Sequence, residues 1–131
     1  MKSRLIVGVL LLVALFSVSA FATRGDGVGP DKQWAIVNFV SPVLVKDAIL
    51  MGPYLIVHDS TKMARGEPCS TFYRFDTKRG PQEAVVAFHC LPATRERCDA
   101  TNLTVVTSPV GFARLIEYQI GGDSEAHGVP K

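Results

Sequence analysis

Outside its first residues, this chain of 131 residues lacks a long segment with sustained helical periodicity. It also lacks a second apolar run of membrane-spanning length, an internal repeat and a low-complexity run. These absences exclude an all-helical bundle, a multi-spanning membrane protein and a repeat protein. They leave a single domain built mainly from short strands.

Residues 1–22 predict a secretory signal peptide. Lys2 and Arg4 form a basic start, residues 5–16 form an apolar middle, and positions 20–22 read Ala-Phe-Ala, a small-residue cleavage pattern. A membrane-spanning helix needs about 20 apolar residues, so this run is short for a retained anchor. We therefore expect a cleaved signal helix and a secreted or periplasmic protein with no stable membrane anchor.

The chain has no excess of one charge once that segment is removed. Lys2 and Arg4 are two of its 14 basic residues, and without them the basic residues equal the 12 acidic residues in number. A neutral chain offers no electrostatic attraction to nucleic acid or to anionic lipid. The expected partner is therefore an unidentified protein or small ligand, and not nucleic acid.

The cysteines lack the spacings of known redox and haem motifs. No Cys-x-x-Cys or Cys-x-x-Cys-His occurs, which excludes a thioredoxin-like redox pair and covalent haem attachment. A cupredoxin needs a histidine soon after its cysteine and a methionine beyond it. No histidine follows Cys90 until His127, and no methionine follows at all, so a cupredoxin is excluded as well.

Short apolar runs separated by turn residues predict an all-β fold. Branched and aromatic residues recur in these runs, and glycine or proline bounds them. We expect six to seven mostly antiparallel strands in a small sandwich or barrel across residues 33–120. Residues 23–32, rich in glycine and charge, predict a flexible leader, and residues 121–131 a C-terminal tail.

The strongest strand signal is residues 83–91, and a second strand-like run, 69–76, precedes it. A Gly-Pro turn signal lies between the two runs, so they predict an antiparallel hairpin. If Asp76 pairs with Glu83, the cysteine of each run lies on the same face, directly opposite the other. A slip of one residue would place the two sulfurs on opposite faces.

Three cysteines in an exported protein indicate one disulfide and one leftover thiol. The hairpin register favours a Cys69–Cys90 disulfide, which leaves Cys98 free. The rival pair is Cys90–Cys98, which would close the short loop between those two positions.

The three histidines form a candidate metal site. His58 and His89 end predicted strands, and His127 lies in the tail beside two acidic residues. Three imidazoles, or two with a carboxylate, would suit zinc or copper, and Met63 or a free Cys98 could add a soft ligand for copper. The first alternative function is therefore a periplasmic metal-binding protein.

A cysteine-dependent enzyme is the second alternative. Cys98 or Cys69 would act as the thiolate, His58 or His89 as the base, and Asp59 would orient that base. No sequence signature fixes this geometry.

The leading expectation is a non-catalytic binding or structural domain without a cofactor. Exported β-domains commonly bind through loops or a sheet edge, and the loops at 59–68 and 93–102 carry mixed charges.

Several short motifs resemble a group of small bacterial proteins that have signal peptides and no known function. The motifs are GEPC at 66–69, FHCLP at 88–92 and GGDSEAHGVP at 121–130, and the resemblance covers most of residues 53–130. It implies no catalytic residues. It does favour Cys69 and Cys90 as disulfide partners, because these two positions fit the group's pattern and Cys98 does not.

Overall fold

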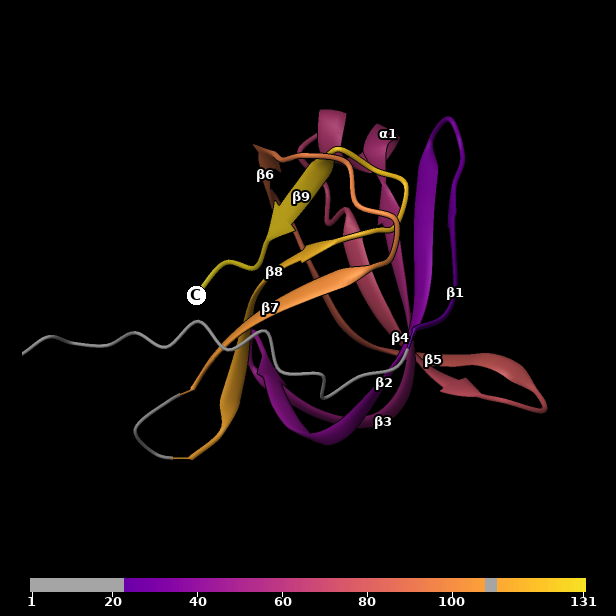
Figure 1. Ribbon diagram of the computed structural model, residues 1–131, viewed down its shortest axis with the longest axis vertical. Coiled ribbons are helices and arrows are strands. Elements are labelled where there is room, and N and C mark those ends of the chain that lie inside the picture. Colours follow the sequence, from indigo (N-terminus) through magenta and orange to yellow (C-terminus); the bar gives the residue numbers. More distant parts are fainter. Residues whose placement is uncertain (1–22, 108–110) are drawn as a thin grey trace, which may run out of the picture.

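The computed structural model describes residues 23–107 and 111–131, so the expected signal peptide at 1–22 lies outside the described residues. Within those ranges the chain forms nine strands and one short helix (Figure 1), which confirms the all-β fold class. The elements are β1 (Thr23–Val28), β2 (Lys32–Val45), β3 (Ala48–Asp59), α1 (Ser60–Ala64), β4 (Ser70–Asp76), β5 (Gly80–Phe88), β6 (Leu91–Thr94), β7 (Asn102–Thr107), β8 (Ala113–Gln119) and β9 (Glu125–Gly128). None of the described residues belongs to a helix that is long and apolar enough to cross a membrane.

The described strands form one mixed sheet in the order β5-β4-β3-β2-β8-β9-β6, with β1 attached to β2 and β7 attached to β8. Every pairing is antiparallel except that of β2 with β8. The end strands β5 and β6 are not paired with each other, so the described sheet does not close into a barrel. The strand count exceeds the expected six or seven because both predicted terminal segments contain strands.

Strand β2 is shared by the two halves of the sheet. Its register with β3 shifts between Phe39 and Val43, where Pro42 cannot donate a backbone hydrogen bond to a neighbouring strand. Before the shift β2 pairs with β1 and β3, and after it Val43 and Leu44 pair with β8 in parallel. The sheet bends here, so that β7, β8 and β9 lie in front of β3 and β4 in Figure 1.

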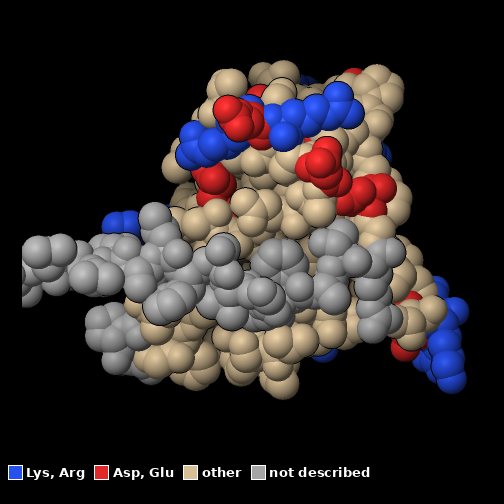
Figure 2. All heavy atoms as spheres, in the orientation of Figure 1, with Lys and Arg blue, Asp and Glu red and all other residues tan. Residues whose placement is uncertain are grey.

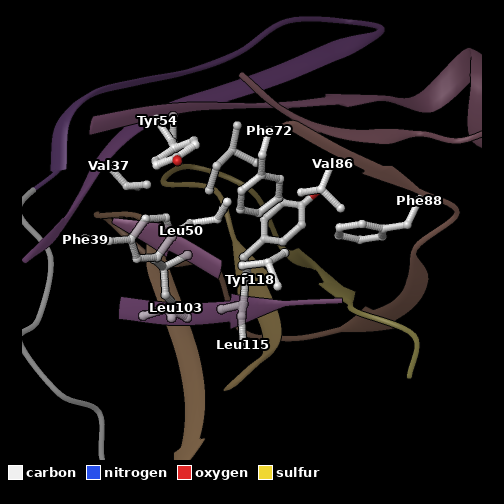
Figure 3. Close-up of a cluster of buried hydrophobic side chains, with 14 of the residues drawn as sticks. Val37, Phe39, Leu50, Tyr54, Phe72, Val86, Phe88, Leu103, Leu115 and Tyr118 are labelled. Carbon is white, nitrogen blue, oxygen red and sulfur yellow. The ribbon is translucent and has the colours of Figure 1, made fainter. Parts of the chain in front are cut away.

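The core lies between the two halves (Figure 3). Along β2 the buried side chains alternate with more exposed ones, as period-two alternation requires. Phe72 of β4 meets Tyr118 of β8 edge to face, with ring centroids 5.9 Å apart. The Tyr118 hydroxyl also shares a hydrogen bond with the hydroxyl of Ser70. Apolar packing and a buried polar contact therefore join the halves at the same point.

The two terminal segments differ from prediction. The predicted flexible leader contains β1, where Gly27 lies beneath the Trp34 ring so closely that an added Cβ would sit 2.5 Å from Nε1. Glycine is disfavoured in strands in general. Here its lack of a side chain lets the indole ring pack directly on the backbone. The predicted tail contains β9, which pairs with both β8 and β6.

The predicted hairpin forms, but its register differs. Asp76 pairs with Gly80 rather than with Glu83, and β5 runs from Gly80 to Phe88. The Asp76 side chain accepts hydrogen bonds from the backbone of Lys78 and Arg79 at 2.8 and 2.9 Å, which tightens the turn. Basic side chains gather at this protruding corner in Figure 2, while acidic and basic groups mix at the opposite end of the same face.

Candidate metal centre

Four side chains that are distant in sequence meet at one end of the core. His58 is the penultimate residue of β3, Cys69 directly precedes β4, Cys90 lies two positions after the end of β5, and His127 lies in β9. Both histidines and Cys90 have no exposed surface, and Cys69 has 1%. Antiparallel pairing of β3, β4 and β5 places the first three together, and the pairing of β9 with β8 adds the fourth.

The Cys69 and Cys90 sulfurs lie 2.9 Å apart, and the backbone N–H of Cys90 donates to the Cys69 sulfur at 3.1 Å. A disulfide bond is about 2.05 Å long, so these are two free thiols in contact. The expectation that this pair meets is therefore correct, whereas the disulfide itself stays a prediction. Cys98 lies elsewhere, with its sulfur 3.5 Å from the carbonyl oxygen of Ile120.

His58 is held in one tautomer. Its Nδ1 is 2.7 Å from the side-chain oxygen of Gln33, which can only accept, so Nδ1 carries the proton. Nε2 then has the lone pair, and it is buried without a hydrogen-bond partner among the described residues. Burial lowers the pKa of His58, which keeps the ring neutral, the form that binds metals.

His127 stacks on His58, with ring centroids 3.8 Å apart and planes inclined by 24°. Its Nδ1 is 3.6 Å from the Cys90 sulfur and 3.7 Å from a carboxylate oxygen of Glu125. Its Nε2 faces a carboxylate oxygen of Asp123 at 3.7 Å. Burial, and then the neighbouring His58, lower the pKa of His127 to about 4, so this ring is also neutral near pH 7.

Two overlapping sets of possible metal ligands share His58. In one set a His58 nitrogen and the sulfurs of Cys69 and Cys90 lie within 4.8 Å of one another, and in the other the partners are Glu125 and His127. An imidazole nitrogen donates its lone pair in the plane of its ring. Two stacked rings therefore cannot both point at one ion. The set of His58 with the two thiols does not require both stacked rings to bind one ion.

Of the three histidines in the predicted metal site, the structure brings His58 and His127 together and leaves His89 apart from them. His89 is exposed, because it follows β5 one position before Cys90 and points to the opposite face. Because both thiols are predicted to form a disulfide, neither is predicted as a metal ligand. Gln33 is not predicted to support the site either, although a glutamine in the buried phase of the alternating strand β2 is a usable signal.

The arrangement does not favour a nucleophilic cysteine. Burial, and then contact with Cys69, raise the pKa of Cys90 to about 12, and burial also raises the pKa of Cys98. Asp59 does not orient His58, because its carboxylate accepts hydrogen bonds from the first turn of α1. Residues 59–68 are therefore not a simple loop as expected, since they contain α1.

An apolar hollow of about 540 Å³ lies on the outer face of the sheet, away from the thiols. Trp34 and Ile36 of β2, Leu55 and Val57 of β3, and Tyr73 of β4 contribute to its lining. This face is suited to an apolar ligand or partner.

Comparisons with protein-family models, curated proteins and solved structures found no match to this chain. The resemblance to a bacterial group therefore stays a prediction.

Proposed function

We propose that this chain is an exported metal-binding protein that binds one thiophilic ion, Zn²⁺ or Cu⁺, at His58, Cys69 and Cys90. The observation that carries the proposal is the buried, unpartnered Nε2 of a histidine whose other nitrogen is fixed by Gln33, next to two free thiols. A hydrogen bond on the non-ligating nitrogen is the usual support of a metal-bound histidine. In this respect the apo protein is already arranged for binding.

The ion would also relieve two unfavourable features of the metal-free cluster. Buried polar atoms normally have partners, and Nε2 of His58 gains one when it coordinates. The thiolate of Cys90 is disfavoured by burial, and a cation offsets that cost because it neutralises the charge on the sulfur. Metal–sulfur bonds of about 2.3 Å in a tetrahedral site place two sulfurs about 3.8 Å apart, so the two thiols would move apart by about 0.9 Å from their 2.9 Å contact when the ion binds.

The test is native mass spectrometry of the purified, reduced protein, titrated separately with Zn²⁺ and with Cu⁺ under nitrogen. One equivalent should bind to the wild type. His58→Gln, Cys69→Ser and Cys90→Ser should each lose it. The matched controls are His89→Gln and Cys98→Ser, which change the same residue types away from the cluster and should retain the ion. Far-ultraviolet circular dichroism checks that each variant is folded.

Two outcomes would overturn this proposal. One is a wild-type protein that binds neither ion in stoichiometric amount. The other is equal loss of metal in the cluster variants and in the His89 and Cys98 controls, since that pattern indicates adventitious surface binding.

A second candidate is a non-catalytic binding domain stapled by a Cys69–Cys90 disulfide. The short distance between the two sulfurs favours it, and the apolar hollow around Trp34 offers a binding surface. Peptide mapping of protein from an exporting host, purified without reductant, distinguishes the two candidates. The disulfide-bonded binding domain is supported if all of the protein contains the Cys69–Cys90 disulfide and if the protein still binds no metal after that disulfide is reduced.

A further inference from the structure

We propose that the metal centre selects Cu⁺ over Zn²⁺ because Met63 provides a third sulfur ligand. This inference rests on the proposed metal-binding function and adds the identity of the ion. The Cys90 thiol donates to the Met63 sulfur at 3.7 Å, so the thioether touches the ligand cluster from the side of α1. Met63 also packs against the buried core although its helix neighbours Lys62 and Ala64 are exposed.

The backbone holds Met63 in this position. The Asp59 carboxylate accepts from the N–H groups of Thr61 and Lys62 at 3.0 and 3.3 Å and so caps α1. The Asp59 N–H donates to the carbonyl oxygen of Cys69 at 2.8 Å, and the Ser60 N–H donates to that of Asp31 at 2.8 Å. Three anchors on a helix of five residues tie its position to that of a metal ligand, Cys69.

The kinds of ligand then identify the ion. Zinc sites in proteins use thiolate, imidazole and carboxylate ligands, whereas thiolate combined with thioether is the preferred set of Cu⁺. The group around Cys90 offers the sulfurs of Cys69, Cys90 and Met63 with one imidazole nitrogen. The hard carboxylate of Glu125 belongs to the other set, with the stacked His127, and does not join the sulfur group.

Met63 is also the most exposed of the four proposed ligands. It is half-buried, whereas the other three are buried. A neutral, polarisable sulfur binds a soft cation without the strong charge attraction that would also draw Zn²⁺, Mg²⁺ or Ca²⁺.

The experiment compares the wild type, Met63→Leu and the control Met51→Leu. Leucine conserves volume and removes only the sulfur. Met51 is a methionine of β3 with 60% of its surface exposed, so its substitution controls for loss of any methionine. Cu⁺ affinity is measured under nitrogen by competition with a chromophoric cuprous chelator, and Zn²⁺ affinity by competition with a zinc chelator. Met63→Leu should weaken Cu⁺ binding about tenfold or more and leave Zn²⁺ binding unchanged, while Met51→Leu should match the wild type for both ions.

X-ray absorption at the copper edge of the wild-type complex gives a direct second measurement, because it counts sulfur neighbours. Three sulfurs support the inference, and two sulfurs overturn it, as does Met63→Leu with wild-type Cu⁺ affinity. In those cases the wild type still binds one ion at His58, Cys69 and Cys90, so the metal-binding function stands. A wild type that binds neither ion overturns both proposals.

Discussion

The substitution Gln33→Leu tests the link between the fold and the proposed metal centre. Gln33 has 7% of its surface exposed and accepts a 2.7 Å hydrogen bond from Nδ1 of the fully buried His58. Leucine has a similar size but no acceptor, so the Nδ1–H group would be left buried and unsatisfied. Such a loss typically costs about 1–3 kcal/mol of unfolding free energy.

The same change should weaken metal binding. Without its acceptor, His58 has no fixed tautomer and no fixed ring orientation, and loss of this kind of support typically costs about 10–100-fold in metal affinity. Gln33→Glu keeps an acceptor oxygen at the same position, so it should retain more affinity than Gln33→Leu. If Gln33 has only a structural role, the two variants should bind the metal with equal affinity whenever their stabilities are equal.

The assay is urea denaturation of the metal-free protein together with competitive metal titration. Gln82→Leu, an exposed glutamine of β5, is the control and should stay within about 0.5 kcal/mol of the wild type. If Gln33→Leu is destabilised but binds metal as tightly as the wild type, Nε2 of His58 is not a ligand. If its stability is unchanged, the reasoning on the buried hydrogen bond is wrong.

Three further predictions follow from the core and the cluster. Phe72→Ala removes a fully buried ring that contacts Tyr118, so the unfolding free energy measured in urea should fall by about 3–5 kcal/mol. The metal-free protein should lose stability as the pH falls from 6.5 toward 4, because the pKa of His127 is about 4 when folded and 6.5 when unfolded, so the unfolded chain takes up the proton first. This change amounts to about 3 kcal/mol, partly offset by Glu125, whose pKa burial raises, and urea denaturation across that pH range measures it. Oxidation of the reduced protein with a disulfide reagent should join Cys69 to Cys90 and abolish metal uptake in native mass spectra. The Cys98→Ser variant should respond to the same reagent as the wild type does.

The fold class could be predicted because strand signals are local. Alternation along β2 and the turn residues between runs were sufficient to predict an all-β domain, and the Gly-Pro turn signal predicted the β4–β5 hairpin, although in another register. Register was less accessible, since the bulges near Tyr73 depend on how β4 twists against its neighbours rather than on the residues of the hairpin alone. Strand β1 was missed because glycine in a strand is favourable only when an aromatic ring, here that of Trp34, lies on it.

The candidate site was partly predicted. The meeting of Cys69 with Cys90 follows from a hairpin, which is a local structure. The approach of His127 depends on a four-residue strand that pairs with β6 and β8, and its sequence shows no apolar alternation from which to predict it. His89 does not lie with the other two histidines, because the same alternation that brings Cys90 inward turns its neighbour outward.

The position of the proposed ligands along the chain has a consequence for how an ion would enter and leave. His58, Met63, Cys69 and Cys90 all come from the run of β3, α1, β4 and β5, whereas the stacked His127 comes from β9, near the end of the chain. Gathering the ligands closes only short loops, and short loops cost little entropy. Docking of β9 requires the remainder of the domain. We therefore expect the ion to exchange by local undocking of this strand, on a timescale faster than global unfolding.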